Sequence, residues 1–145
     1  MNGRFAALED DGKIERVPAG RAEVERLHAL VVRDVETANE LRDRNRDWAL
    51  AIVYNALLQA CLALMTAHGY RARGESQHRT AIDFARLSLP EHEQRVDRVD
   101  RLRRRRHRAV YALAGEVTES DLNDAFALAE QLLPLLREAA LRALG

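Results

Sequence analysis

Apolar residues recur every three or four positions along much of this chain, which is the period of an α-helix. In residues 21–41 this spacing predicts an amphipathic helix with one apolar face. The residues on that face are Val24, Leu27, Val31, Val35, Ala38 and Leu41. A second helix is predicted to begin at Asp43 or Asn45 and to end at His68, with Gly69 as its stop. It is apolar on nearly every side, so we expect it to be the central helix.

Turn and cap signals divide the rest of the chain into three further helices. Residues 69–75 form a glycine-containing connector, and residues 76–89 a third helix that ends before Pro90. The fourth helix is predicted to begin near Glu91 and to carry a run of arginines. Five helices with short connectors predict an all-α, up-and-down bundle of four or five helices.

The last predicted helix has a clear sequence signal for its start, whereas the first 20 residues have no helical pattern. Thr118, with Asp121 three residues further on, resembles a capping box and predicts the start of the fifth helix. Residues 1–20 mix acidic residues with glycines and a proline and have little helical period. They are expected to form an irregular amino-terminal arm, ahead of one helical domain over residues 21–145.

The composition agrees with a single helical domain. The chain has 145 residues, of which 47% are hydrophobic and 32% charged, with few glycines, prolines or aromatic residues. Cys61 is the one cysteine and lies in an apolar stretch, so we expect neither a disulfide nor a cysteine-based metal cluster. No secretory signal is seen, and polar residues interrupt the longest apolar run, which favours a core helix over a membrane span. A soluble, cytoplasmic protein without a membrane association is expected.

Positive charge is local, because the formal net charge is zero while residues 95–108 are rich in arginine. On a helical wheel, Arg106 falls within an apolar stripe. The other members of that stripe are Val96, Val99, Leu102, Ala109, Val110 and Leu113. A guanidinium in that position needs a partner, a subunit interface or a ligand, because burying it unpaired is costly.

The remaining residues of the run divide into two faces. Arg103, His107 and Tyr111 lie with Arg106 on one flank of the stripe, because residues three or four apart share a helix face. The other arginines are expected to point toward water and to pair with Asp97 and Asp100 or with nothing. They are Arg101, Arg104, Arg105 and Arg108.

Two more sets of polar residues bear on chemistry. Asn55 and Gln59 lie one turn apart on the apolar second helix, so their amides need hydrogen-bond partners. Either they form a core or interface network, or they support a site around Arg106. The histidines do not follow a metal-binding spacing such as His-Glu-x-x-His, so no metal and no cofactor are expected.

Three segments together resemble one protein family. They are residues 102–111, LRRRRHRAVY; residues 54–60, YNALLQA; and the connector 69–75, GYRARGE, with His78. These segments resemble the HEPN superfamily of prokaryotic helical domains, in a bacterial branch in which a tyrosine stands at the usual histidine of the Arg-x-x-x-x-His motif. The resemblance covers roughly residues 42–111 and implies a HEPN-like homodimer whose two arginine-bearing helices face each other across one cleft.

The resemblance also implies a function. Active members of this family cleave RNA in that cleft without a metal, and the family is common in toxin–antitoxin and defence systems, often beside a nucleotidyltransferase. By position, Arg106 would clamp a phosphate, with Arg103 and Arg104 as further RNA-binding residues. Tyr111 replaces the signature histidine, and a phenol is a poor base at neutral pH. His107 is therefore the expected base, with Tyr111 as a hydrogen-bond or proton donor, or else Tyr111 accepts AMP from a partner enzyme.

Two function classes follow from these observations. The first is an RNA-directed HEPN-like domain, either a weak metal-independent endoribonuclease or an RNA binder. The second is a non-catalytic helical dimerisation domain that binds a partner protein, such as a nucleotidyltransferase or an antitoxin. Binding to RNA phosphates must weaken steeply with salt, whereas a hydrophobic interface need not, and this difference separates the two.

Overall fold

The computed structural model describes residues 3–111 and 116–145, with side chains described for residues 3–106 and 116–145. Helices make up most of the described chain, so the predicted all-α class is confirmed. The elements are η1 (Gly3–Phe5), α1 (Ala6–Asp10), β1 (Ile14–Arg16), α2 (Arg21–Leu41), α3 (Arg46–Ala67), β2 (Tyr70–Ala72), α4 (Gln77–Ser88), η2 (Pro90–His92), α5 (Glu93–Tyr111) and α6 (Glu119–Leu144).

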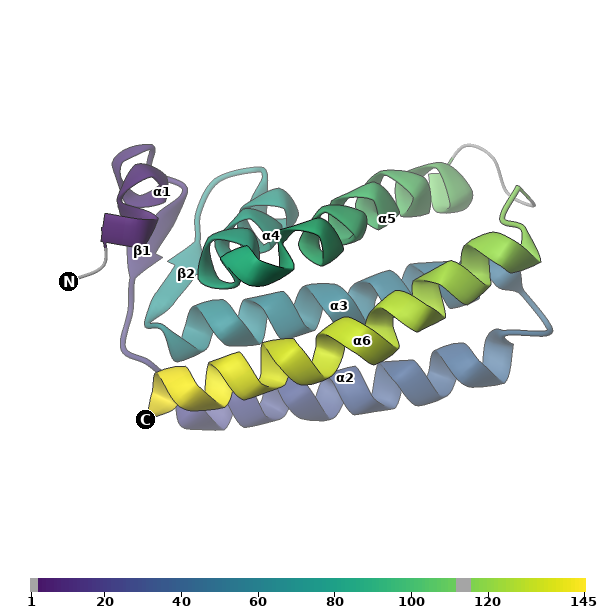
Figure 1. The fold of residues 1–145 in the computed structure, drawn as a ribbon, viewed down its shortest axis with the longest axis horizontal. Coiled ribbons are helices and arrows are strands. Elements are labelled where there is room, and N and C mark those ends of the chain that lie inside the picture. The colour runs from purple at the N-terminus through teal and green to yellow at the C-terminus, as the bar shows by residue number, and fades with distance from the viewer. Residues whose placement is uncertain (1–2, 112–115) are drawn as a thin grey trace.

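Helix α3 is the centre of the fold. In Figure 1 it runs between α2 and α6 on one side and α4 and α5 on the other, and it contacts all four. Leu50, Leu57 and Leu64, two turns apart along α3, have no exposed surface. Helix α3 is long and apolar enough to cross a membrane, but 78% of its most apolar 18-residue window is buried inside the bundle. The predicted central core helix is therefore confirmed, and its burial is consistent with a soluble protein.

Side chains cap the starts of α3 and α6, and the cap of α6 is the one that the sequence predicts. Asn45 precedes α3, and its side chain accepts a hydrogen bond from the Trp48 backbone nitrogen at 3.1 Å. Before α6, the Thr118 hydroxyl accepts from the Asp121 backbone nitrogen and the Asp121 carboxylate accepts from the Thr118 nitrogen, each at 3.0 Å. This reciprocal pair is the predicted capping box, and it fixes where α6 begins on the far side of α5.

The amino-terminal arm differs from the prediction of an irregular segment. Residues 3–16 contain η1, α1 and β1, and the side chains of Phe5, Leu8 and Ile14 are buried in the same core as the bundle. Strand β1 pairs antiparallel with β2, so that Ile14 lies opposite Ala72. A five-residue helix and a three-residue strand are too short to show a period, and both depend on contacts with residues distant in sequence.

The connector after α3 contains a β-strand, β2, although its two glycines predict only a turn. Gly69 has a φ of 82°, and a Cβ there would lie 3.0 Å from the Val17 carbonyl oxygen. The left-handed turn sends the chain directly into β2, which holds the arm against the bundle. Cys61 lies in the core with no exposed surface, and burial raises the pKa of its thiol to about 12, as expected for a small buried hydrophobe.

Candidate functional site

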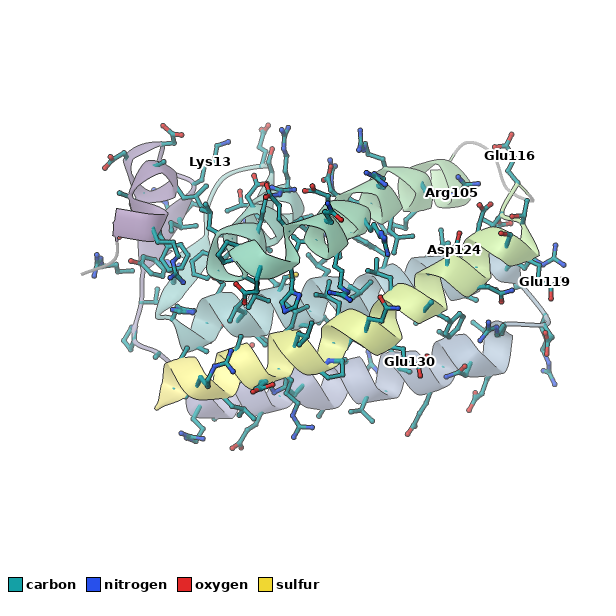
Figure 2. All side chains as sticks on the ribbon, viewed as in Figure 1. Lys13, Arg105, Glu116, Glu119, Asp124 and Glu130 are labelled. Carbon is teal, nitrogen blue, oxygen red and sulfur yellow. The ribbon has the colours of Figure 1, made fainter. Side chains whose placement is uncertain are left out.

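An open groove of about 1630 Å³ lies between the start of α4, the middle of α5 and the first half of α6. Among the described residues, seven arginines and three carboxylates line it. The arginines are Arg79, Arg98, Arg101, Arg103, Arg104, Arg105 and Arg106. We call this feature the arginine groove. Figure 2 labels Arg105 on α5 and Asp124 on α6, which belong to two different walls of the groove.

Arg106 points toward the bundle, as its place in the apolar stripe predicts. Its Cζ atom lies 5.8 Å from the centroid of the Tyr54 ring, and the arginine is half-buried while Tyr54 has no exposed surface. This is the geometry of a cation–π contact. Leu102, one turn earlier on α5, packs in the core. The guanidinium is therefore held against an aromatic face from α3 at the inner side of the arginine groove.

His78 also belongs to this part of the groove. Its Nδ1 atom lies 3.2 Å from the Tyr54 hydroxyl oxygen, which joins α4 to α3. Burial, followed by the nearby charges of Arg106 and Arg103, lowers the pKa of His78. Burial raises the pKa of Tyr54. At neutral pH the pair is therefore a neutral imidazole beside a neutral phenol.

The arginines of α5 lie near two carboxylates, of which the sequence predicts Asp100 but not Asp121. Arg103 Nε donates to Asp100 Oδ1 at 3.0 Å, and Arg104 lies 3.6 Å from the same carboxylate. Arg104 is mostly exposed, as predicted. Arg105, which was expected to point toward water, forms an ion pair with Asp121 of α6. The predicted partner was wrong, although the Arg105 side chain is still 39% exposed, because a helical wheel of α5 alone carries no information about α6.

Asn55 and Gln59 form the core network and do not support the arginine groove. The Asn55 amide donates to Asp34 Oδ2 at 2.9 Å, and the Gln59 amide donates to the same oxygen. Asp34 comes from α2 and is only 6% exposed. On α3, Asn55 is one position beyond Tyr54 and so is rotated by about 100° from it. It therefore faces α2 while Tyr54 faces α5. Of the two alternatives for these amides, the core network is confirmed and support of the Arg106 site is wrong.

Two predicted site residues, His107 and Tyr111, lie outside the residues whose side chains are described, so their assigned roles stay predictions. Sequence reasoning assigned no role to Tyr54, which lies against Arg106, or to His78, which lines the groove. Their pairing could not be found from periodicity, because they belong to helices 24 positions apart. Within residues 3–106 and 116–145, no three His, Cys, Asp or Glu side chains are grouped so that they could hold a metal ion.

Comparisons with protein-family models, with curated proteins and with solved structures find no match for this chain. The resemblance to HEPN domains therefore stays a prediction. The chemistry of the arginine groove is the basis for the function proposed below.

Proposed function

We propose that this chain is an RNA-directed helical domain that binds the phosphodiester backbone of RNA in the arginine groove. The observation that carries the proposal is the excess of arginines over carboxylates among the described residues that line one open groove. Guanidinium groups match phosphate oxygens in geometry and stay charged at every physiological pH. Contacts of this kind supply most of the affinity of proteins for nucleic acids.

The shape of the groove supports a polymeric ligand. Pockets for small molecules are usually enclosed, mostly apolar and of about 300–1,000 Å³. The arginine groove is larger, at about 1630 Å³, and is open to solvent along α5. Arginines at successive turns of α5, such as Arg98, Arg101 and Arg105, can contact successive phosphates along a strand. A chain of phosphates fits this arrangement better than a single small anion.

The choice of RNA, and of a cellular role, comes from the resemblance to HEPN domains. On that basis we propose a cytoplasmic homodimer that belongs to a toxin–antitoxin or defence system, with a nucleotidyltransferase or antitoxin as its partner. We further propose weak, metal-independent cleavage of RNA, in which Arg106 stabilises the charge that develops on the phosphate. His107 and Tyr111 keep their predicted roles as base and donor in this proposal.

The experiment is a binding titration of a labelled single-stranded RNA, repeated at several salt concentrations. We expect the affinity to fall steeply between about 50 and 200 mM salt, with a slope that reports the number of phosphate contacts. Arg106→Gln should weaken binding by about tenfold and lower the salt slope by about one. Arg26→Gln is the matched control, because this substitution removes the same charge from an exposed arginine of α2. Arg26 is paired with Glu23 and lies outside the groove. Equal losses in both variants would contradict the proposal.

The second candidate function is a non-catalytic interaction domain. Its support is that Arg103, Arg104 and Arg105 already have carboxylate neighbours within the chain. A helix face that carries both signs of charge suits a protein partner. Under this alternative the titration would show no binding of RNA that depends on Arg106, and dimerisation or partner capture would persist in high salt.

A further inference from the structure

The hydrogen-bonded pair of Tyr54 and His78 is not among the residues proposed to contact phosphate, although it lies beside Arg106. Tyr54 has no exposed surface and supports the Arg106 guanidinium with its ring. Its hydroxyl is 3.2 Å from Nδ1 of His78. His78 lines the arginine groove and is itself exposed to it. One aromatic side chain of the core therefore holds both a guanidinium and an imidazole at the same wall.

Charges of both signs surround His78, and those that lower its pKa are two arginines of α5. Helix α5 contributes Arg103 and Arg106, the first of them paired with Asp100. Arg79 and Glu75 flank His78 along the chain. Across the groove, α6 contributes the carboxylates of Asp121 and Asp124, and Asp121 is already paired with Arg105. Burial, followed by the charges of Arg106 and Arg103, disfavours an imidazolium at this position and lowers the pKa of His78.

A phosphate between His78 and the two guanidiniums would reverse this balance. Its negative charge offsets the repulsion from Arg103 and Arg106 and gives a protonated imidazole a hydrogen-bond acceptor. A phenol hydroxyl can donate to a neutral imidazole nitrogen and can accept from a protonated one. The Tyr54 hydroxyl can therefore stay bonded to Nδ1 in both states, which leaves Nε2 for a ligand.

We propose that His78 is a phosphate ligand that takes up one proton from solvent when RNA binds, so that an imidazolium joins Arg103 and Arg106 around one phosphodiester. Tyr54 is the positioning residue that orients the ring. This inference rests on the proposed function, because it names one phosphate subsite within the arginine groove. RNA binding is then linked to protonation and is stronger at lower pH.

The test measures RNA affinity across about pH 6 to 8. For wild type we expect the affinity to rise as the pH falls, by at most about tenfold per pH unit, which is the limit for uptake of one proton. Calorimetry in two buffers of different ionisation enthalpy should show the same uptake directly. His78→Gln should bind RNA with an affinity that varies little with pH. Its exposed position in the first turn of α4 leaves the fold intact, which circular dichroism checks.

Two matched variants separate His78 from other histidines. His92→Gln alters a histidine outside the arginine groove, near Arg95, and should keep the wild-type pH dependence. His107→Gln is not a neutral control, because His107 belongs to the proposed site; it tests whether this histidine, rather than His78, causes the pH dependence. If His107→Gln abolishes the pH dependence while His78→Gln retains it, the assignment to His78 is overturned.

The outcomes also separate this inference from the proposed function. RNA binding that depends on Arg106 but not on pH would overturn the inference and leave the function standing. No binding of RNA at any pH would overturn both. Inorganic sulfate, a free anion whose charge is constant in this pH range, serves as a second probe. Proton uptake with sulfate but not with RNA would overturn the assignment to a phosphodiester of RNA.

Discussion

Two polar clusters lie on different faces of α3 and have different consequences. Toward α2, the Asp34 carboxylate accepts hydrogen bonds from Asn55 and Gln59, and all three side chains are buried or half-buried. Toward α5, Tyr54 contacts His78 and Arg106 at the wall of an open groove. The first cluster is complete within the chain. The second has an excess of positive charge that faces solvent, which is what an anionic ligand requires.

The strength of the contacts supports the second cluster, rather than the first, as the candidate ligand site. Breaking a buried, hydrogen-bonded charge network typically costs about 3–5 kcal/mol, so the Asp34 network has a single stable arrangement. Ion pairs at a partly exposed surface contribute about 0–1 kcal/mol each. Arg103 with Asp100, and Arg105 with Asp121, are pairs of this second kind, with side chains 24–39% exposed. A phosphate can therefore displace these carboxylates from the arginines at little cost.

The largest expected effect is the loss of stability when the Asp34 network is broken. Asp34→Ala should lower the free energy of unfolding by about 3 kcal/mol, because the buried amides of Asn55 and Gln59 lose their acceptor. Urea denaturation measures this change. The RNA affinity of the folded protein should stay the same, because Asp34 lies outside the arginine groove.

Arg33→Ala is the control for Asp34. Arg33 donates to the same carboxylate at 3.0 Å, but its side chain is 64% exposed, so its loss should cost about 1 kcal/mol or less. If Asp34→Ala also costs 1 kcal/mol or less, the distinction between the two clusters is wrong.

A smaller effect is expected at Asp121, which belongs to both a helix cap and the arginine groove. Asp121→Ala removes one half of the capping box and should lower the free energy of unfolding by about 1 kcal/mol. It also releases Arg105 from its ion pair, so RNA should bind more tightly. Thr118→Ala damages the same cap and leaves the Asp121 carboxylate in place, so it should reduce stability without the gain in affinity. Equal affinities in the two variants would show that the carboxylate does not compete with RNA.

The smallest effect per residue is the response of stability to pH. Burial lowers the pKa of His28, His68 and His78 below the unfolded value of 6.5, with nearby arginines adding to the effect. Below that value the unfolded chain binds protons that the native chain does not, so stability is lost as the pH falls. The melting temperature should be constant above about pH 7.5 and should fall progressively below pH 6.5.

His28→Gln makes the pH prediction specific. His28 is half-buried, and its Nε2 atom has no hydrogen-bond partner among the described residues. The substitution should reduce the decline in melting temperature between about pH 7 and pH 5, whereas His92→Gln should not. A decline that is unchanged in His28→Gln would show that other groups cause it.

Much of the fold could be predicted from local sequence signals. The helix over residues 21–41 was predicted with the bounds that α2 has, Asn45 is one of the two predicted starts of α3, and the cap at Thr118 is the one expected. These features depend on residues within about one helical turn of each other, so one sequence is sufficient to find them. The amino-terminal arm was missed, because Phe5 is buried by stacking on Phe84 of α4 and Ile14 by the pairing of β1 with β2.

The candidate site was predicted less completely. The wheel correctly directed Arg106 toward the bundle, because its orientation depends on α5 alone. The same reasoning did not find the partner of Arg105 on α6, and the alternative that Asn55 supports a site around Arg106 was wrong. Each of these side chains has its partner on another helix, and helical periodicity contains no information on which helices are neighbours.

The sequence by itself determined the five long helices, the cap of α6, which helix is central and that Arg106 points inward. Only the tertiary structure decided which side chains meet. The deciding contacts join residues far apart in the chain: Tyr54 and His78 are 24 positions apart, Asp34 and Asn55 are 21 apart, and Arg105 and Asp121 are 16 apart. Helix formation depends on interactions within a few residues, whereas such contacts depend on how the apolar faces of different helices pack. The arginine groove is a product of that packing.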